Sequence, residues 1–305
     1  MRHLQTYRIF EATQTLTDEQ KEFLNGHTIG TWSLNPSTGK VDIDGDFKCY
    51  SEYLEDFKGI SFGSVSGNFY CRDSHLKTLG GAPETVGGDF SCYGNSLRTL
   101  EGAPETVGGS FDCYENNIRT LEGAPRTVGG NFYCNYNSLQ TLVGAPRTVG
   151  GSFDCSHNSL QTLVGAPETV GRDFHCNNNS LQTLEGAPRK VGGSFDCSYN
   201  PLRTLEGAPE TVGRKFYSGE IEIPDGEWSL ETLILIFTTG TPKQKQLVKP
   251  LVDPKVLQQQ IDENPEGMLV KLKGHLKHPH FKDLNWPKHL GQEKDLLSDL
   301  SDIGL

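Results

Sequence analysis

The sequence has little of what a membrane protein or a nucleic-acid-binding protein needs. Its longest purely apolar run is Leu233–Phe237, far short of the ~20 residues of a membrane-spanning helix. No stretch near Met1 has the apolar core of a secretory signal. Lys and Arg total 28 against 39 Asp and Glu, a net charge of −11. Neither a membrane nor nucleic acid is therefore expected as a partner, because neutralising phosphates requires a cationic face.

Motifs of catalysis and metal binding are also missing. The sequence contains no G-x-x-x-x-G-K-[ST], H-E-x-x-H or G-x-S-x-G motif, the patterns of phosphate binding, zinc hydrolysis and serine nucleophiles. No two cysteines form a C-x-x-C pair, the spacing that indicates a zinc or redox site. We therefore predict no catalytic residue, no metal and no cofactor, and expect a protein that is not an enzyme.

An internal repeat dominates what the sequence does contain. Nine phenylalanines recur at a spacing of 22 and then 21 residues: Phe47, Phe69, Phe90, Phe111, Phe132, Phe153, Phe174, Phe195 and Phe216. A cysteine stands two residues after each of the first eight, which accounts for all eight cysteines, and Ser218 takes the ninth place. The unit V-G-G-x-F-x-C-x-x-N-x-L-x-T-L-x-G-A-P predicts a solenoid of about nine stacked turns over 47–218.

The F-x-C spacing predicts which side chains form the core. An extended segment points residues two apart to the same side, so each Phe and Cys should face the interior. The predicted core includes Phe90, Cys92, Phe111, Cys113, Phe132, Cys134, Phe153 and Cys155. We interpret the cysteines as small buried hydrophobes in a reducing compartment, the cytoplasm, with a disulfide framework or a zinc site as the alternatives.

An asparagine follows most of the cysteines by three residues. This column consists of Asn95, Asn116, Asn137, Asn158, Asn179 and Asn200. An amide both donates and accepts, so stacked asparagines can satisfy backbone groups where the chain leaves a strand and turns. We predict a structural asparagine ladder. The Gly-Ala-Pro segment should then turn the chain into an extended back wall.

The repeat resembles the leucine-rich-repeat family. The family consensus L-x-x-L-x-L-x-x-N-x-L maps onto 107–118, with one extra residue before the aromatic. The resemblance covers roughly 47–217, and the 21-residue length is most similar to the short bacterial class known from secreted effectors. It implies a curved leucine-rich-repeat solenoid with a parallel β-sheet on the concave face.

The two ends of the chain differ from the repeat. We expect a flexible tail over 1–16 and an α+β cap over 17–46, with a capping box at 17–20 and strands over 31–34 and 40–43. Proline-led segments after 218 predict an all-α C-terminal region over 219–305. Its helices are expected near 229–238, 242–251, 254–263, 265–277 and 291–302.

The strand residues that face away from the core form the candidate binding surface. They vary between turns whose framework is constant, and they are rich in tyrosine, as recognition surfaces are. The predicted partner-binding residues are Tyr70, Tyr93, Asp112, Tyr114, Tyr133, Asp154, His175, Asp196 and Tyr217. We predict a non-enzymatic protein-binding scaffold with a basic protein partner, and no particular oligomeric state. A merely solvated strand face is the alternative.

Three groups of polar residues allow metal or acid–base chemistry, although an ordinary solvated surface is the preferred interpretation of each. Asp154, His175 and Asp196 should lie on adjacent turns. The segment 42–46 reads D-x-D-G-D, like a calcium loop, but lacks the later glutamate. His275, His278 and His280 lie close together in the C-terminal region.

Resemblance implies two other functions. Leucine-rich repeats of this class precede ubiquitin ligase domains in secreted effectors, but those enzymes need a C-terminal cysteine and none follows Cys197. Residues 4–12 resemble capsid-targeting peptides of tailed-phage head proteins, with a cleavage point after Glu11. That resemblance implies a phage protein packaged in the virion.

Overall fold

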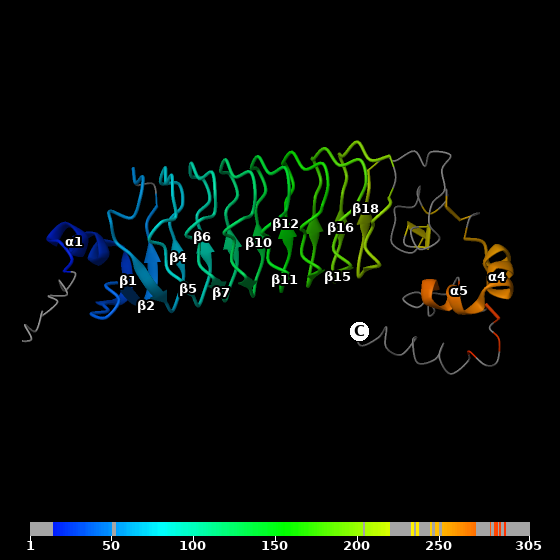
Figure 1. The fold of residues 1–305 in the computed structure, drawn as a ribbon, viewed down its shortest axis with the longest axis horizontal. Coiled ribbons are helices and arrows are strands. Elements are labelled where there is room, and N and C mark those ends of the chain that lie inside the picture. The colour runs from blue at the N-terminus through cyan, green and yellow to red at the C-terminus, as the bar shows by residue number, and fades with distance from the viewer. Residues whose placement is uncertain are drawn as a thin grey trace, which may run out of the picture.

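The computed structural model describes residues 15–50, 53–203, 205–219 and 252–272, together with isolated residues between 233 and 290. Its main body is a parallel β-solenoid whose turns stack side by side along one axis (Figure 1), so the solenoid prediction is confirmed. The proposed cleavage point after Glu11 and the cluster of His275, His278 and His280 lie outside the described residues. So do the expected helix over 291–302 and most of those over 229–238 and 242–251.

Each turn of the solenoid contributes two short strands in separate columns. The first, here called the Phe column, consists of β4 (Phe69–Tyr70), β6 (Phe90–Ser91), β8 (Phe111–Asp112), β10 (Phe132–Tyr133), β12 (Phe153–Asp154), β14 (Phe174–His175), β16 (Phe195–Asp196) and β18 (Phe216–Tyr217). The second, the Val column, consists of β3 (Phe62–Val65), β5 (Thr85–Val86), β7 (Thr106–Val107), β9 (Thr127–Val128), β11 (Thr148–Val149), β13 (Thr169–Val170), β15 (Lys190–Val191) and β17 (Thr211–Val212). Neighbouring strands of a column are parallel and place equivalent residues side by side.

The Val column is the main departure from the sequence-based expectation, which assigned no strand to the Thr-Val pair. In the structure Thr106 pairs with Thr85 and Thr127, and Val107 pairs with Val86 and Val128. A pair of residues shows no period of its own, so only pairing with the neighbouring turns makes it a strand.

The N-terminal cap starts both columns. Helix α1 (Asp18–His27) begins at Thr17 with the expected capping box, in which the Thr17 hydroxyl accepts from the Gln20 N–H and the Gln20 side chain accepts from the Thr17 N–H. Strands β1 (Thr28–Leu34) and β2 (Val41–Lys48) form an antiparallel hairpin. Both are longer than expected, and β2 pairs in parallel with β3 and β4. The hairpin therefore covers the first edge of the solenoid.

All turns share a single interior. The rings of the Phe column stack with centroids 4.8–5.5 Å apart from Phe47 to Phe216. The eight cysteine side chains are fully buried, and their thiols are not joined in disulfides. Burial raises the pKa of the thiols from Cys71 to Cys197 well above its usual value. Each turn buries its apolar side chains against its neighbours, so the contacts between turns stabilise the solenoid.

Two described helices follow the solenoid. Helix α4 (Pro254–Glu263) coincides with the expected helix and begins at Asp253, whose carboxylate accepts from the Lys255 N–H. Helix α5 (Pro265–Leu272) begins as expected, and its described part ends at Leu272 rather than at 277. Within the described residues, no helix has the length and apolar character needed to cross a membrane.

Candidate partner-binding surface

The strand face, as we call it, consists of the residues directly after each Phe and directly after each Cys. Because Phe and Cys point inward, these positions point away from the core. The first set is Lys48, Tyr70, Ser91, Asp112, Tyr133, Asp154, His175, Asp196 and Tyr217, and the second is Tyr50, Arg72, Tyr93, Tyr114, Asn135, Ser156, Asn177 and Ser198. All nine residues predicted to bind a partner lie on this face. Most are half-buried, and Tyr217 is 37% exposed.

The asparagine ladder supports one edge of the strand face. The Asn116 amide donates to the carbonyls of Cys92 and Cys113 at 3.0 and 3.2 Å, and its oxygen accepts from the Leu97 N–H at 3.0 Å. The same donor pattern recurs at Asn95, Asn137, Asn158, Asn179 and Asn200. These bonds tie the end of each Phe-column strand to the turn before it.

A second polar ladder, which the sequence analysis missed, supports the other edge. The residue before each Phe accepts the backbone N–H of its equivalent in the next turn, as Asp89 does from Ser110 at 2.7 Å and Asn131 from Ser152 at 2.8 Å. Its members are Asp46, Asn68, Asp89, Ser110, Asn131, Ser152 and Asp173. The available signal was that each is a short side chain with an acceptor oxygen.

Aromatic residues gather around Arg72 at the N-terminal end of the strand face. The Arg72 guanidinium lies 4.6 Å from the centre of the Tyr50 ring and 5.4 Å from those of Tyr70 and Tyr93. The rings of Tyr93 and Tyr114 stack 4.5 Å apart at 12°. Cation–π contacts and stacking hold these side chains in fixed positions. We call these five residues the tyrosine platform; the role of Arg72 in it was not anticipated.

Asp112 lies beside the tyrosine platform in an unusual environment for a carboxyl group. Loss of solvent raises the pKa of Asp112 to about 6, although hydrogen bonds from the Tyr114 N–H and the Ser91 hydroxyl favour the ionised form. Burial and the nearby Tyr93 and Asp112 raise the pKa of Tyr114 to about 12. The tyrosine hydroxyl therefore stays protonated and can donate to a partner.

The C-terminal half of the strand face is more polar. Asp154, His175 and Asp196 lie side by side on β12, β14 and β16. One oxygen of Asp154 accepts from the N–H and the hydroxyl of Ser156 at 2.9 and 2.6 Å, and Asp196 and Ser198 repeat this arrangement. Within the described ranges, no three His, Cys, Asp or Glu side chains are placed to hold a metal ion. The interpretation of these three residues as a cation site is therefore wrong, because the carboxylates are oriented toward the serines.

One more aromatic group lies where the chain leaves the strand face. The second residue after Cys has a left-handed backbone in successive turns, including Tyr136 (φ 51°), His157 (φ 53°) and Tyr199 (φ 54°). The rings of Tyr136 and His157 stack 4.2 Å apart, and Tyr136 and Tyr199 are 53% and 79% exposed. The sequence pattern does not indicate these side chains, because their direction depends on the unusual backbone angle.

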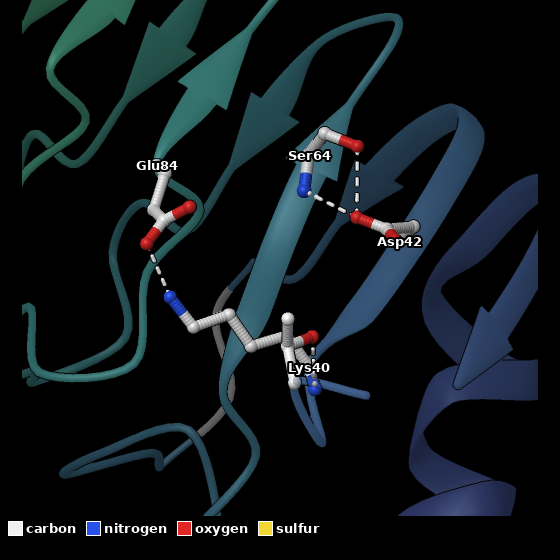
Figure 2. Close-up of polar contacts among 5 residues, drawn as sticks. Lys40, Asp42, Ser64 and Glu84 are labelled. Carbon is white, nitrogen blue, oxygen red and sulfur yellow. Dashed lines mark hydrogen bonds and ion pairs between the residues drawn. The ribbon is translucent and has the colours of Figure 1, made fainter. Parts of the chain in front are cut away.

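The segment 42–46 is part of strand β2, as Figure 2 shows for its first carboxylate. Asp42 accepts from the N–H and the hydroxyl of Ser64 in the next turn at 2.7 and 2.8 Å, and Lys40 pairs with Glu84 one turn further along. Asp44 accepts from the Ser66 hydroxyl, and Asp46 accepts from the Asn68 N–H. These carboxylates join the cap to the solenoid, so the calcium-loop interpretation is wrong.

Comparison with known proteins identifies no relative: no family model, curated protein or solved structure matches this chain.

Proposed function

We propose that the protein is a non-enzymatic scaffold of the leucine-rich-repeat type whose strand face captures a protein partner. The observation that carries the proposal is the tyrosine platform, in which Arg72 and four tyrosine rings are held by stacking on a hydrogen-bonded frame. Rigid aromatic anchors bind at a low cost in conformational entropy, so binding surfaces are enriched in them.

The contrast between the frame and the strand face supports this function. Phe, Cys, Asn and Val recur with little change from turn to turn, whereas the strand face changes from Tyr70 to Ser91 to Asp112 on successive turns. A face that contacts only solvent gives no reason for half-buried tyrosine side chains at particular turns. Carboxylates on the face and the net charge of −11 favour a basic partner.

The proposal is tested with a random-peptide library displayed on phage and selected on the full chain. Peptides enriched by the wild type are titrated by calorimetry against a Tyr114→Ala/Tyr133→Ala double variant. We expect at least a tenfold loss of affinity, since two aromatic anchors are removed, with little change in the unfolding midpoint.

The matched control is Thr127→Ala/Thr148→Ala, which truncates two exposed side chains of the Val column and should leave peptide affinity unchanged. The proposal fails if selection enriches no peptide, or if the enriched peptides bind the tyrosine variant as tightly as the wild type.

A further inference from the structure

Carboxylates and rings alternate along the strand face. From β8 to β16, the residues after Phe are Asp112, Tyr133, Asp154, His175 and Asp196, in register on adjacent parallel strands. Neighbouring strands lie about 4.8 Å apart. Successive carboxylates therefore recur about every 9.6 Å along the solenoid axis, with one ring between each pair.

The three carboxylates are held in the same orientation. In each, one oxygen accepts the N–H of the residue two positions later, at 3.3 Å from Tyr114, 2.9 Å from Ser156 and 3.0 Å from Ser198. The second oxygen of Asp112 accepts from the Ser91 hydroxyl at 3.3 Å, whereas those of Asp154 and Asp196 accept no bond from any described residue. The face thus offers an ordered row of carboxylates with the ring of Tyr133 or His175 between each pair.

We propose that this row binds an extended basic segment in the polyproline II conformation, with Lys or Arg at every third residue. The proposal rests on the proposed protein-binding function and names the chemistry of the partner. A polyproline II chain has three residues per turn and rises about 3.1 Å per residue. Its every third side chain shares one face and recurs about every 9.3 Å, close to the carboxylate spacing.

Other regular conformations fit less well. A β-strand places side chains on one face about every 6.7 Å, so three cations cannot meet three carboxylates about 9.6 Å apart. On an α-helix, the same face recurs every seven residues, or about 10.5 Å. Over the three carboxylates of the row, its side chains would be about 2 Å out of register. The corresponding error for polyproline II is about 0.6 Å.

The residues around the row define its limits and its contacts. Tyr133 and His175 provide ring surfaces between the carboxylates, the kind of surface on which proline-rich segments dock. Beyond Asp112, toward the N-terminal end, Arg72 and Lys48 carry the opposite charge. A basic segment should therefore occupy β8–β16, and the tyrosine platform around Arg72 should contact a different part of the same partner.

The experiment compares two synthetic peptides of identical composition with the full chain. One carries three arginines at every third position, separated by proline pairs; the other carries them at every second position. We expect the first to bind about tenfold more tightly in low salt, since only that spacing brings all three charges into register.

Variants of the protein separate register from net charge. Asp154→Asn keeps the acceptor for Ser156 and removes the central charge, so affinity for the first peptide should fall about fivefold. Glu105→Gln changes the net charge equally at an exposed site in front of β7 and should have no effect.

Equal binding of the two peptides would overturn the proposed register, and so would equal effects of the two variants. If neither peptide binds, the basic polyproline partner is wrong. The peptide library then decides separately whether the strand face binds protein at all.

Discussion

Asp112 combines a cost in stability with the binding role that we propose for the strand face. Its carboxyl group is half-buried between turns that present tyrosine rings, and its pKa is raised to about 6. A raised pKa means that the folded state binds the proton more tightly than the unfolded chain does. The contribution of Asp112 to the stability of the folded state is therefore favourable below about pH 4 and is lost as the pH rises through 6.

Replacing Asp112 by Asn should stabilise the protein at pH 8 by roughly 1–3 kcal/mol and change little at pH 4, because the amide keeps hydrogen-bonding capacity without a charge. Chemical denaturation of both proteins at pH 4, 6 and 8 measures the difference. Glu105→Gln, at an exposed position, serves as the control for general charge effects. A difference that does not depend on pH would contradict the assignment.

At the scale of elements, the sequence predicts the strands whose side chains alternate and misses those whose do not. The F-x-C spacing identifies β4–β18 of the Phe column because two buried residues flank an outward one. The Thr-Val pairs carry one inward residue each, between Pro and Gly, which is also the pattern of a turn. The acceptor ladder from Asp46 to Asp173 was missed for a related reason, since its bonds join residues 21 or 22 positions apart and no local pattern shows them.

The glycines between the two strands of each turn have unequal roles. A Cβ on Gly129 would overlap the carbonyl oxygen of Gly108 in the turn before it. The next position tolerates a side chain, because Arg172 and Arg214 occupy it in other turns. The first glycine is therefore needed for the close approach of two backbones.

Gly129→Ala should lower the free energy of unfolding by about 2 kcal/mol or more, because the overlapping atom is backbone and cannot move without displacing the stack. The neighbouring Gly130→Ala should cost less, about 1 kcal/mol, because arginine occupies the equivalent position in two other turns and the backbone there therefore adjusts to a side chain. Urea denaturation of the two variants provides the comparison. Equal losses of unfolding free energy in the two variants would show that both glycines are needed only for the conformational freedom of the backbone.

For the whole molecule, equivalent turns stack in the same way, so the number of turns can change while the contacts between turns stay the same. Each turn contacts its neighbours through the same pairs, so stability is close to a sum over turns and interfaces. Removing one complete repeat should join matching surfaces without leaving an exposed apolar edge. The strand face, in contrast, differs from turn to turn, so the choice of the deleted repeat decides whether the spacing of the carboxylate row changes.

Deleting 129–149 removes Tyr133 and brings Asp112 next to Asp154, whereas deleting 87–107 removes an equal length outside the row. Both proteins should fold with the circular dichroism of a β-solenoid and a modest loss of stability. The first deletion should abolish the preference for arginines at every third position, because Asp112 and Asp154 would then lie about 4.8 Å apart. The second deletion should retain it. Peptide titration of the two proteins therefore separates carboxylate spacing from total charge, and the same preference in both would show that spacing has no part in recognition.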